Sequence, residues 1–190
     1  MSHARADAWA RLVAAAPANW VLDHARAVEG LAVAMARAAK ASGNMVDEPL
    51  VSMGALLHDI GRSVSHGVDH ASIGARILRE DHWPPPLVDI VERHTGAGID
   101  EAEAAQLGLP VKDYTPRTLE ERLVAHADNL LSGVKRLDLG QVLEKYHAQG
   151  LDDAGAKIER LHRELGQLLH ADLDALAPVE LAPPESHRLP

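Results

Sequence analysis

The chain of 190 residues contains no cysteine and no phenylalanine. The lack of cysteine excludes disulfide bonds, thiolate zinc sites and cysteine nucleophiles. Because 46% of the residues are apolar and only 3% are aromatic, a core must be built from Ala, Leu, Val and Ile. This composition favours closely packed helices over a β-sandwich.

Positive charge and long apolar runs are also scarce. The sequence has 19 Lys and Arg residues and 28 Asp and Glu residues, so the formal net charge is −9. We therefore expect no nonspecific nucleic-acid binding, although a small phosphate ester can bind where a cation supplies local positive charge. No uncharged run approaches the roughly 20 residues that span a bilayer, and the first residues lack a signal-peptide core. We expect a cytoplasmic protein with no membrane partner.

Apolar residues recur at helical spacing, and no strand alternation extends beyond a few residues. We predict an all-α fold, a bundle of about seven or eight helices. The chain has the length of one domain, and its composition does not change along the sequence in a way that marks a second one. We therefore expect one domain over residues 1–177, followed by a Pro-rich tail over 178–190. The predicted helices cover 4–14, 19–42, 47–61, 69–78, 84–94, 100–107, 118–131 and 152–176.

The most informative motif is His58-Asp59-Ile60-Gly61, which follows an apolar stretch. On a helix, the adjacent side chains of His58 and Asp59 diverge by about 100°, so they can share only a cation off the helix edge. His24 and Asp128 lie among apolar residues of other predicted helices, where an unpaired polar group is costly. A shared metal ion would satisfy all four residues.

His70 and His94 each lie at the edge of a predicted helix, near a glycine-containing bend. With Asp59 as a bridging carboxylate, they provide ligands for a second metal ion. Imidazole and carboxylate ligands suit Fe, Mn, Co, Ni or Zn, and the sequence does not choose among these divalent transition metals.

The pattern His24, His58-Asp59, Asp128 resembles that of the HD-domain superfamily of metal-dependent phosphohydrolases, and residues 58–62 resemble its HDIG form. The segments 69–78 and 92–98, with His70 and His94, resemble the two-metal branch. That branch includes HD-GYP cyclic-dinucleotide phosphodiesterases and mixed-valent diiron oxygenases. The HHE and GYP signature is absent here, which argues against a cyclic-di-GMP substrate. More closely, residues 20–132 resemble a group of HDIG proteins found in archaea and some bacteria.

The resemblance implies an HD-domain helical bundle whose metal-binding core covers residues 20–132. It implies a hydrolase that attacks a small, nucleotide-like phosphate ester through a metal-activated hydroxide. The implied ligands of two metal ions per chain are His24, His58, Asp59, His70, His94 and Asp128.

Further residues near the motif are candidates for catalysis and substrate binding. Asp59 is catalytic as the shared ligand, and Arg62 can hold a phosphate with its planar guanidinium. His66 can act as a general acid and contact the substrate. Lys112 is a weaker candidate for substrate binding, and the other candidates for the pocket wall are Arg93, Tyr114 and Asn129.

Two alternatives remain open at this stage. The second choice is a diiron oxygenase, which the resemblance also allows and which would use the same six ligands with iron and activate O₂. A metal-stabilised regulatory module without turnover is a third class. A homo-oligomer is possible, because the charged face of residues 152–176 can serve as a solvated surface or as a dimer contact.

Overall fold

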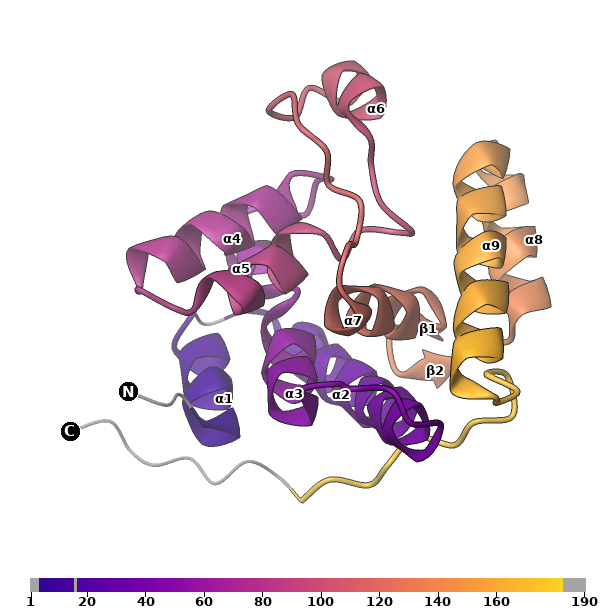
Figure 1. Ribbon diagram of the computed structural model, residues 1–190. Helices are drawn as coiled ribbons and strands as arrows, with labels where there is room; N and C mark the ends of the chain where they lie inside the picture. The colour runs from indigo at the N-terminus through magenta and orange to yellow at the C-terminus, as the bar shows by residue number, and fades with distance from the viewer. Residues whose placement is uncertain (1–3, 16, 183–190) are drawn as a thin grey trace.

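The computed structural model describes residues 4–15 and 17–182, and over these residues the fold is all-α, as predicted. Nine α-helices, one 3-10 helix and a two-stranded hairpin lie in the described part of the chain (Figure 1). The elements are α1 (Arg5–Ala14), α2 (Asn19–Ala41), α3 (Glu48–Leu57), η1 (Ile60–Ser63), α4 (His70–Glu80), α5 (Pro85–Glu92), α6 (Glu101–Gln106), α7 (Leu119–Asn129), β1 (Leu131–Ser132), β2 (Lys135–Arg136), α8 (Leu139–Ala148) and α9 (Asp152–Leu169).

The helix α2 forms the centre of the bundle, and α3, α7 and α9 pack against it. Its residues Val28, Leu31 and Met35 recur at helical spacing and are fully buried. A second apolar cluster joins α1, α3, α4 and α5 around Leu56 and Leu78. Both clusters are mainly aliphatic, as the absence of phenylalanine requires.

The helix α3 ends at Leu57, so the prediction of a helix through residue 61 was wrong. His58 and Asp59 lie on the turn between α3 and η1, not on a regular helix. This turn can pack against α4 because residue 61 is a glycine: a Cβ at position 61 would be 2.0 Å from the carbonyl oxygen of His70. This close backbone contact brings the His58-Asp59 pair next to the first turn of α4.

The connection between α5 and α7 carries α6 away from the bundle, as Figure 1 shows. Asp100 caps α6 by accepting a hydrogen bond from the backbone N–H of Glu103. The ammonium of Lys157, on α9, lies 2.5 Å from a Glu103 carboxylate oxygen and 3.5 Å from one of Asp100. These ion pairs connect α6 to α9 across a groove.

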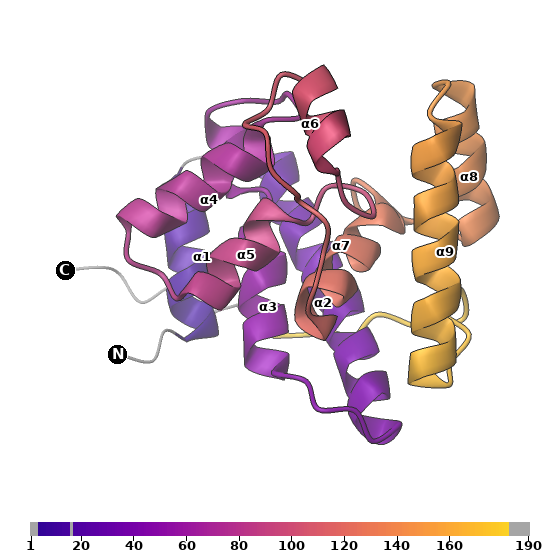
Figure 2. The ribbon, with the colours of Figure 1, turned by 45° about the horizontal axis from the view of Figure 1, so that its top comes forward.

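The hairpin β1–β2 and the helix α8 are additions to the predicted elements. Asp138 begins α8 with a capping box that includes Gln141. Views from two directions place α8 beside α9 on one flank of the bundle (Figures 1 and 2).

The helix α9 ends at Leu169, so the predicted end at residue 176 was also wrong. The hydroxyl of Ser42 donates a hydrogen bond to the carbonyl oxygen of Leu169, and the amide of Asn44 donates one to that of Leu168. His170 then adopts a left-handed backbone with φ of 49°. The last carbonyls are therefore satisfied by another part of the chain, and the helix stops there.

The start of the predicted tail lies along α2, where the backbone N–H of Val179 donates a hydrogen bond to the carbonyl of Gly30. Residues 183–190 of that tail lie outside the described residues. No helix within the described ranges combines the length and the hydropathy that a bilayer crossing requires.

Candidate metal centre

Four histidines from different parts of the fold meet at the centre of the molecule, and each is held by a backbone carbonyl. A carbonyl oxygen only accepts hydrogen bonds, so Nδ1 of each ring must carry the proton. The Nε2 atom is then left free to bind a cation when the ring is neutral. The four pairs are His24 with Gly133 at 2.7 Å, His58 with Ala55 at 2.7 Å, His70 with Gly67 at 2.8 Å, and His94 with Val91 at 2.8 Å.

The four Nε2 atoms surround the carboxylate of Asp59. Its Oδ1 lies 3.1 Å from Nε2 of His70 and 3.6 Å from that of His94. Its Oδ2 lies 3.6 Å from Nε2 of His58 and 3.9 Å from that of His24. Asp59 therefore faces two histidines with each oxygen, which is the arrangement expected of a bridging ligand.

Asp128, on α7, closes the same cluster. Its Oδ1 lies 2.9 Å from Nε2 of His24 and 3.6 Å from Nε2 of His58. On the other side of Asp59, the Nε2 atoms of His70 and His94 are 3.0 Å apart. The folded chain thus brings together all six residues that the sequence predicted as metal ligands.

The cluster contains buried polar atoms that the described residues do not satisfy. Nε2 of His58 and Oδ1 of Asp59 are buried and have no hydrogen-bond partner within the described part of the chain. Buried polar groups without partners are costly, and a cation would satisfy both atoms. Three overlapping sets have ligand atoms within 4.8 Å of one another: His24–His58–Asp59, His58–His94–Asp128 and Asp59–His70–His94. These residues fit one or more divalent metal ions.

Burial and charge move the pKa values of these residues in opposite directions. Burial lowers the pKa of His58 to about 4, so this ring is neutral at pH 7. Burial also opposes charge on His24, but the hydrogen bond and the negative charge of Asp128 raise the pKa of His24 to about 8. Burial disfavours the Asp128 carboxylate, yet His24 lowers its pKa to about 2. Without a metal ion, His24 therefore carries a proton at neutral pH that a metal ion must replace.

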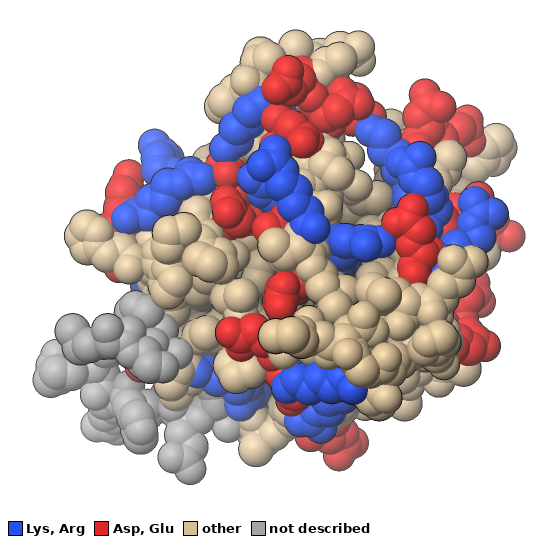
Figure 3. All heavy atoms as spheres, in the orientation of Figure 1, with Lys and Arg blue, Asp and Glu red and all other residues tan. Residues whose placement is uncertain are grey.

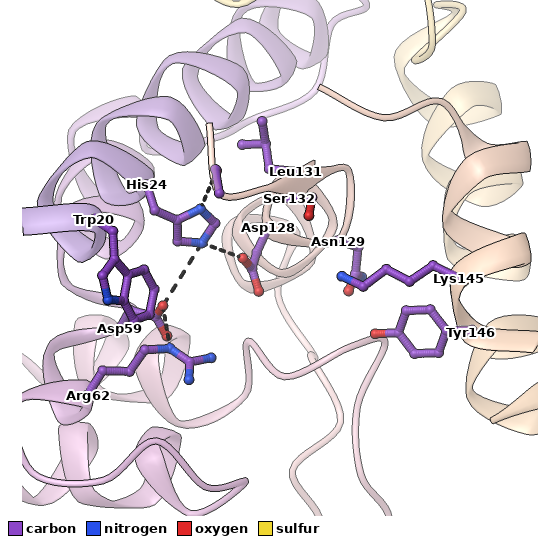
Figure 4. A pocket seen from close by; sticks show the side chains of 11 residues that line it. Trp20, His24, Asp59, Arg62, Asp128, Asn129, Leu131, Ser132, Lys145 and Tyr146 are labelled. Carbon is purple, nitrogen blue, oxygen red and sulfur yellow. Dashed lines mark hydrogen bonds and ion pairs between the residues drawn. The ribbon is translucent and has the colours of Figure 1, made fainter. Parts of the chain in front are cut away.

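The centre opens into a cavity of about 320 Å³, drawn in Figure 4. Arg62 lies on one wall, where its Nε donates a 2.6 Å hydrogen bond to Oδ2 of Asp59 and its guanidinium lies 6.0 Å from the ring centre of Trp20. Lys145 and Tyr146, on α8, lie on the opposite wall and point inward. The lining residues are Trp20, His24, Asp59, Arg62, Asp128, Asn129, Leu131, Ser132, Gly133, Lys145 and Tyr146.

Other predicted site residues lie outside this cavity. His66 is exposed, 6.0 Å from the ring of Trp20, and does not line the cavity. Lys112 pairs with Glu92 at 2.6 Å instead. Of the weaker candidates for the pocket wall, Asn129 lines the cavity, whereas Arg93 and Tyr114 do not.

Sequence reasoning missed several side chains of this cavity, among them Trp20, Lys145 and Tyr146. It gave Trp20 no role in the site, but Trp20 is 49% exposed and lines the cavity. It did not recognise α8, and so it missed Lys145 and Tyr146. A signal was available for α8, since Asp138 and Gln141 form a capping-box pattern before Val142.

One face of the molecule carries charges of both signs. Figure 3 shows Lys and Arg side chains interspersed with Asp and Glu side chains over the face of the molecule seen in Figure 1. Nonspecific nucleic-acid binding relies on many basic side chains that neutralise phosphates together. This face presents no continuous basic surface of that kind in the part of the chain that the structure describes.

Comparison with known proteins gives a family match and several relatives. The family model described as "HD domain" matches residues 21–133. The tRNA (cytidine(56)-2'-O)-methyltransferase of Thermoplasma volcanium is 46% identical over 158 residues, which cover 83% of this chain and 45% of the relative. An uncharacterized protein of Methanocaldococcus jannaschii is 52% identical over 126 residues, which cover 66% of this chain and 75% of the relative. The chain spans less than half the length of the methyltransferase.

A solved structure has a similar fold. It is the crystal structure of the HD domain of the L. monocytogenes phosphodiesterase PgpH in complex with cyclic-di-AMP. The TM-score is 0.50 with 19% sequence identity, and the match covers 85% of this chain and 98% of that domain. At this identity the likeness concerns the fold.

Proposed function

Because the chain belongs to the HD domain family, we propose that it is a metal-dependent phosphohydrolase that acts on a small, nucleotide-like phosphate ester. One observation carries this proposal: four Nε2 atoms and two carboxylates converge in a buried cluster, where His58 Nε2 and Asp59 Oδ1 lack partners. Such a donor set suits divalent transition metals, and the cavity beside it is open to a substrate.

The comparisons support a phosphate-bearing substrate. The solved structure with a similar fold is that of a phosphodiesterase domain bound to a cyclic dinucleotide. The relative from Thermoplasma volcanium is named for the methylation of tRNA, but this chain matches only 45% of that protein. Methyl transfer is therefore not part of the proposal, whereas an RNA phosphate belongs among the substrates to be tested.

We assign the six clustered residues as ligands of two metal ions, with Asp59 shared between them. Bound cations would activate a water molecule as the nucleophile and offset the charge on the phosphoryl oxygens. The backbone hydrogen bonds on Nδ1 hold the four rings in place, so the site is formed before substrate arrives.

Arg62 is the residue we assign to the phosphate on the near wall. Its Nε is engaged by Asp59, while its two terminal nitrogens form no hydrogen bond within the described residues. These nitrogens can donate to two oxygens of one phosphoryl group. In the reaction, a water oxygen bonds to phosphorus, the P–O bond to the ester group breaks, and the leaving oxygen takes up a proton.

A screen of metal-loaded protein tests the proposal. Protein loaded in turn with Mn, Fe, Co, Ni and Zn is assayed with p-nitrophenyl phosphate, bis(p-nitrophenyl) phosphate, nucleotides, cyclic dinucleotides and a short RNA. We expect phosphate, p-nitrophenol or nucleotide product with at least one metal, and none after chelation. Oxygen consumption by iron-loaded protein without hydrolysis would replace the proposal with the diiron oxygenase. Bound metal without either activity would replace it with the regulatory module.

A further inference from the structure

The far wall of the cavity comes from α8, which lies beyond the residues matched by the family model. Val142 is fully buried in the main core, and Tyr146 lies four residues later on the same side of the helix. The ring of Tyr146 packs against the core cluster while its hydroxyl points into the cavity (Figure 4). Lys145 extends beside it, toward Asn129.

Lys145 differs from most other lysines of this chain. Lys40, Lys112 and Lys157 each pair with a carboxylate. Lys145 forms no ion pair or hydrogen bond with any residue that the structure describes, although it lines a cavity that contains Asp59 and Asp128. An exposed cation that points into an open cavity is available to an anionic ligand.

Tyr146 is shared by the linings of two cavities. It lines the cavity of the metal centre and also a groove of about 580 Å³ between α6 and α9. Lys157 bridges the groove by its ion pairs with Glu103 and Asp100. The apolar residues that line the groove are Val68, Ala97, Ile99, Leu107, Leu151 and Ala154.

We propose that Lys145 and Tyr146 are substrate-binding residues, with the Lys145 ammonium paired to a phosphoryl oxygen and the Tyr146 hydroxyl donating a hydrogen bond to the same group. This inference rests on the proposed function, because it assigns the phosphoryl group to the cavity of the metal centre. Arg62 and Lys145 then hold that group from opposite walls.

The position of Tyr146 also determines where the rest of the substrate lies. A phosphoryl group held beside Tyr146 directs its ester group past that ring and into the groove between α6 and α9. The groove is lined by both apolar and polar residues, which suit a nucleoside or another flat organic group. The substrate class is therefore a phosphate monoester or diester with a sizeable organic group.

Calorimetric titration of manganese-loaded protein with inorganic phosphate tests the role of Lys145 without turnover. We expect Lys145→Met to weaken phosphate binding about tenfold and Tyr146→Phe to weaken it about threefold. Lys145→Arg should restore affinity to within about threefold of the wild type. The matched control is Lys135→Met, since Lys135 is exposed and lines neither cavity. Metal content should equal that of the wild type in all four variants.

Titration with adenosine monophosphate tests the groove. Ala154 lies on the groove wall in the first turn of α9, so Ala154→Trp should obstruct the groove. We expect this variant to bind adenosine monophosphate about tenfold more weakly and inorganic phosphate as well as the wild type does. The Lys145→Met variant should bind both ligands more weakly.

The outcomes separate this inference from the proposed function. Equal phosphate affinity in Lys145→Met and wild type, or no phosphate binding by wild type, would overturn the inference. Unchanged adenosine monophosphate binding in Ala154→Trp would overturn the assignment of the groove. A wild-type protein that binds phosphate through Lys145 but hydrolyses no ester would contradict the proposed function and still support the phosphate-binding site.

Discussion

The metal centre and the far wall of its cavity are built in different ways. On one side, four histidine rings and Asp59 are buried, and each ring is held by a backbone carbonyl. On the other side, Lys145 is exposed and makes no polar contact with the described residues. The first group lies within the family match and the second beyond it.

This difference separates two tasks that an active site performs. Side chains fixed in advance suit cation binding, because metal ions need ligands in set positions. A free cation on a separate helix suits substrate recognition, which differs from one protein to the next. We therefore expect changes in the buried cluster to abolish metal binding, and changes on α8 to alter affinity for substrate alone.

The largest effect should come from Asp59→Asn. This change removes the charge that all four histidines face, and it leaves only one oxygen to act as a ligand. We expect kcat/KM to fall about 1,000-fold and the metal content to drop. Asp89→Asn is the matched control, since Asp89 is 42% exposed in side-chain area and lies on α5 outside the cavity. Full metal content and activity in Asp59→Asn would refute the role of a shared ligand.

The second-largest effect should come from Gly61→Ala, which tests whether the turn between α3 and η1 positions the metal-binding cluster. The added methyl group would lie 2.0 Å from the His70 carbonyl oxygen and 2.7 Å from the Gly74 nitrogen. Since these are backbone atoms, the turn must move, and we expect the free energy of unfolding to fall by about 3 kcal/mol. Urea denaturation of metal-free protein measures this change.

The control for that change is Gly140→Ala on α8. Its added methyl group would lie 3.3 Å from Oδ1 of Asp138, the oxygen that caps α8, and a shift of a few tenths of an ångström relieves this contact without breaking the cap. Alanine also favours a helix over glycine, so we expect stability equal to the wild type or slightly above it. A Gly61→Ala variant as stable as this control would contradict the contact between the turn and α4.

A smaller effect concerns pH. The pKa of His24 is raised to about 8, so this ring is protonated below pH 8 and must lose a proton when a metal ion binds. Release of this proton should therefore raise the apparent association constant of Mn²⁺ by close to tenfold from pH 6 to 7, by about fivefold from pH 7 to 8, and more slowly above pH 8. Titrations at pH 6, 7, 8 and 9 measure it. A constant that does not change between pH 6 and 8 would show that His24 is not a ligand.

The smallest effect should come from His66→Ala. A general acid contributes about 100-fold or more to a rate, but His66 is exposed and lies outside the cavity. We expect kcat to change less than about threefold, with the basic limb of the pH–rate profile unchanged. A loss of 100-fold, with loss of that limb, would restore His66 as the general acid.

Much of the fold could be predicted from the sequence, because strong local patterns decide it. The periodic apolar residues of α2 and the cap at Thr118 identify long helices and their starts. Two of the six clustered residues, His24 and Asp128, could also be predicted because a polar group among apolar residues needs a partner, whereas the other four followed from the His58-Asp59 motif and the family resemblance. His24 and Asp128 are 104 positions apart, yet burial makes them meet.

The features that could not be predicted depend on contacts between residues far apart in the sequence, which local patterns do not indicate. The helix α9 ends where Ser42 and Asn44 bind its last carbonyls, and these residues lie more than 120 positions away. The turn at Asp59 depends on Gly61 touching α4. The inward direction of Lys145 follows from how α8 packs on α9, which the spacing of its few apolar residues does not reveal.

Metal analysis of the purified protein tests the central claim most directly. After loading with Mn²⁺ and removal of the excess ion, inductively coupled plasma mass spectrometry gives the number of metal ions per chain. The arrangement of four Nε2 atoms around Asp59 predicts two per chain in the wild type and a clear loss in His58→Ala, with the exposed His147→Ala as control. Wild-type protein that retains no metal ion would contradict the account.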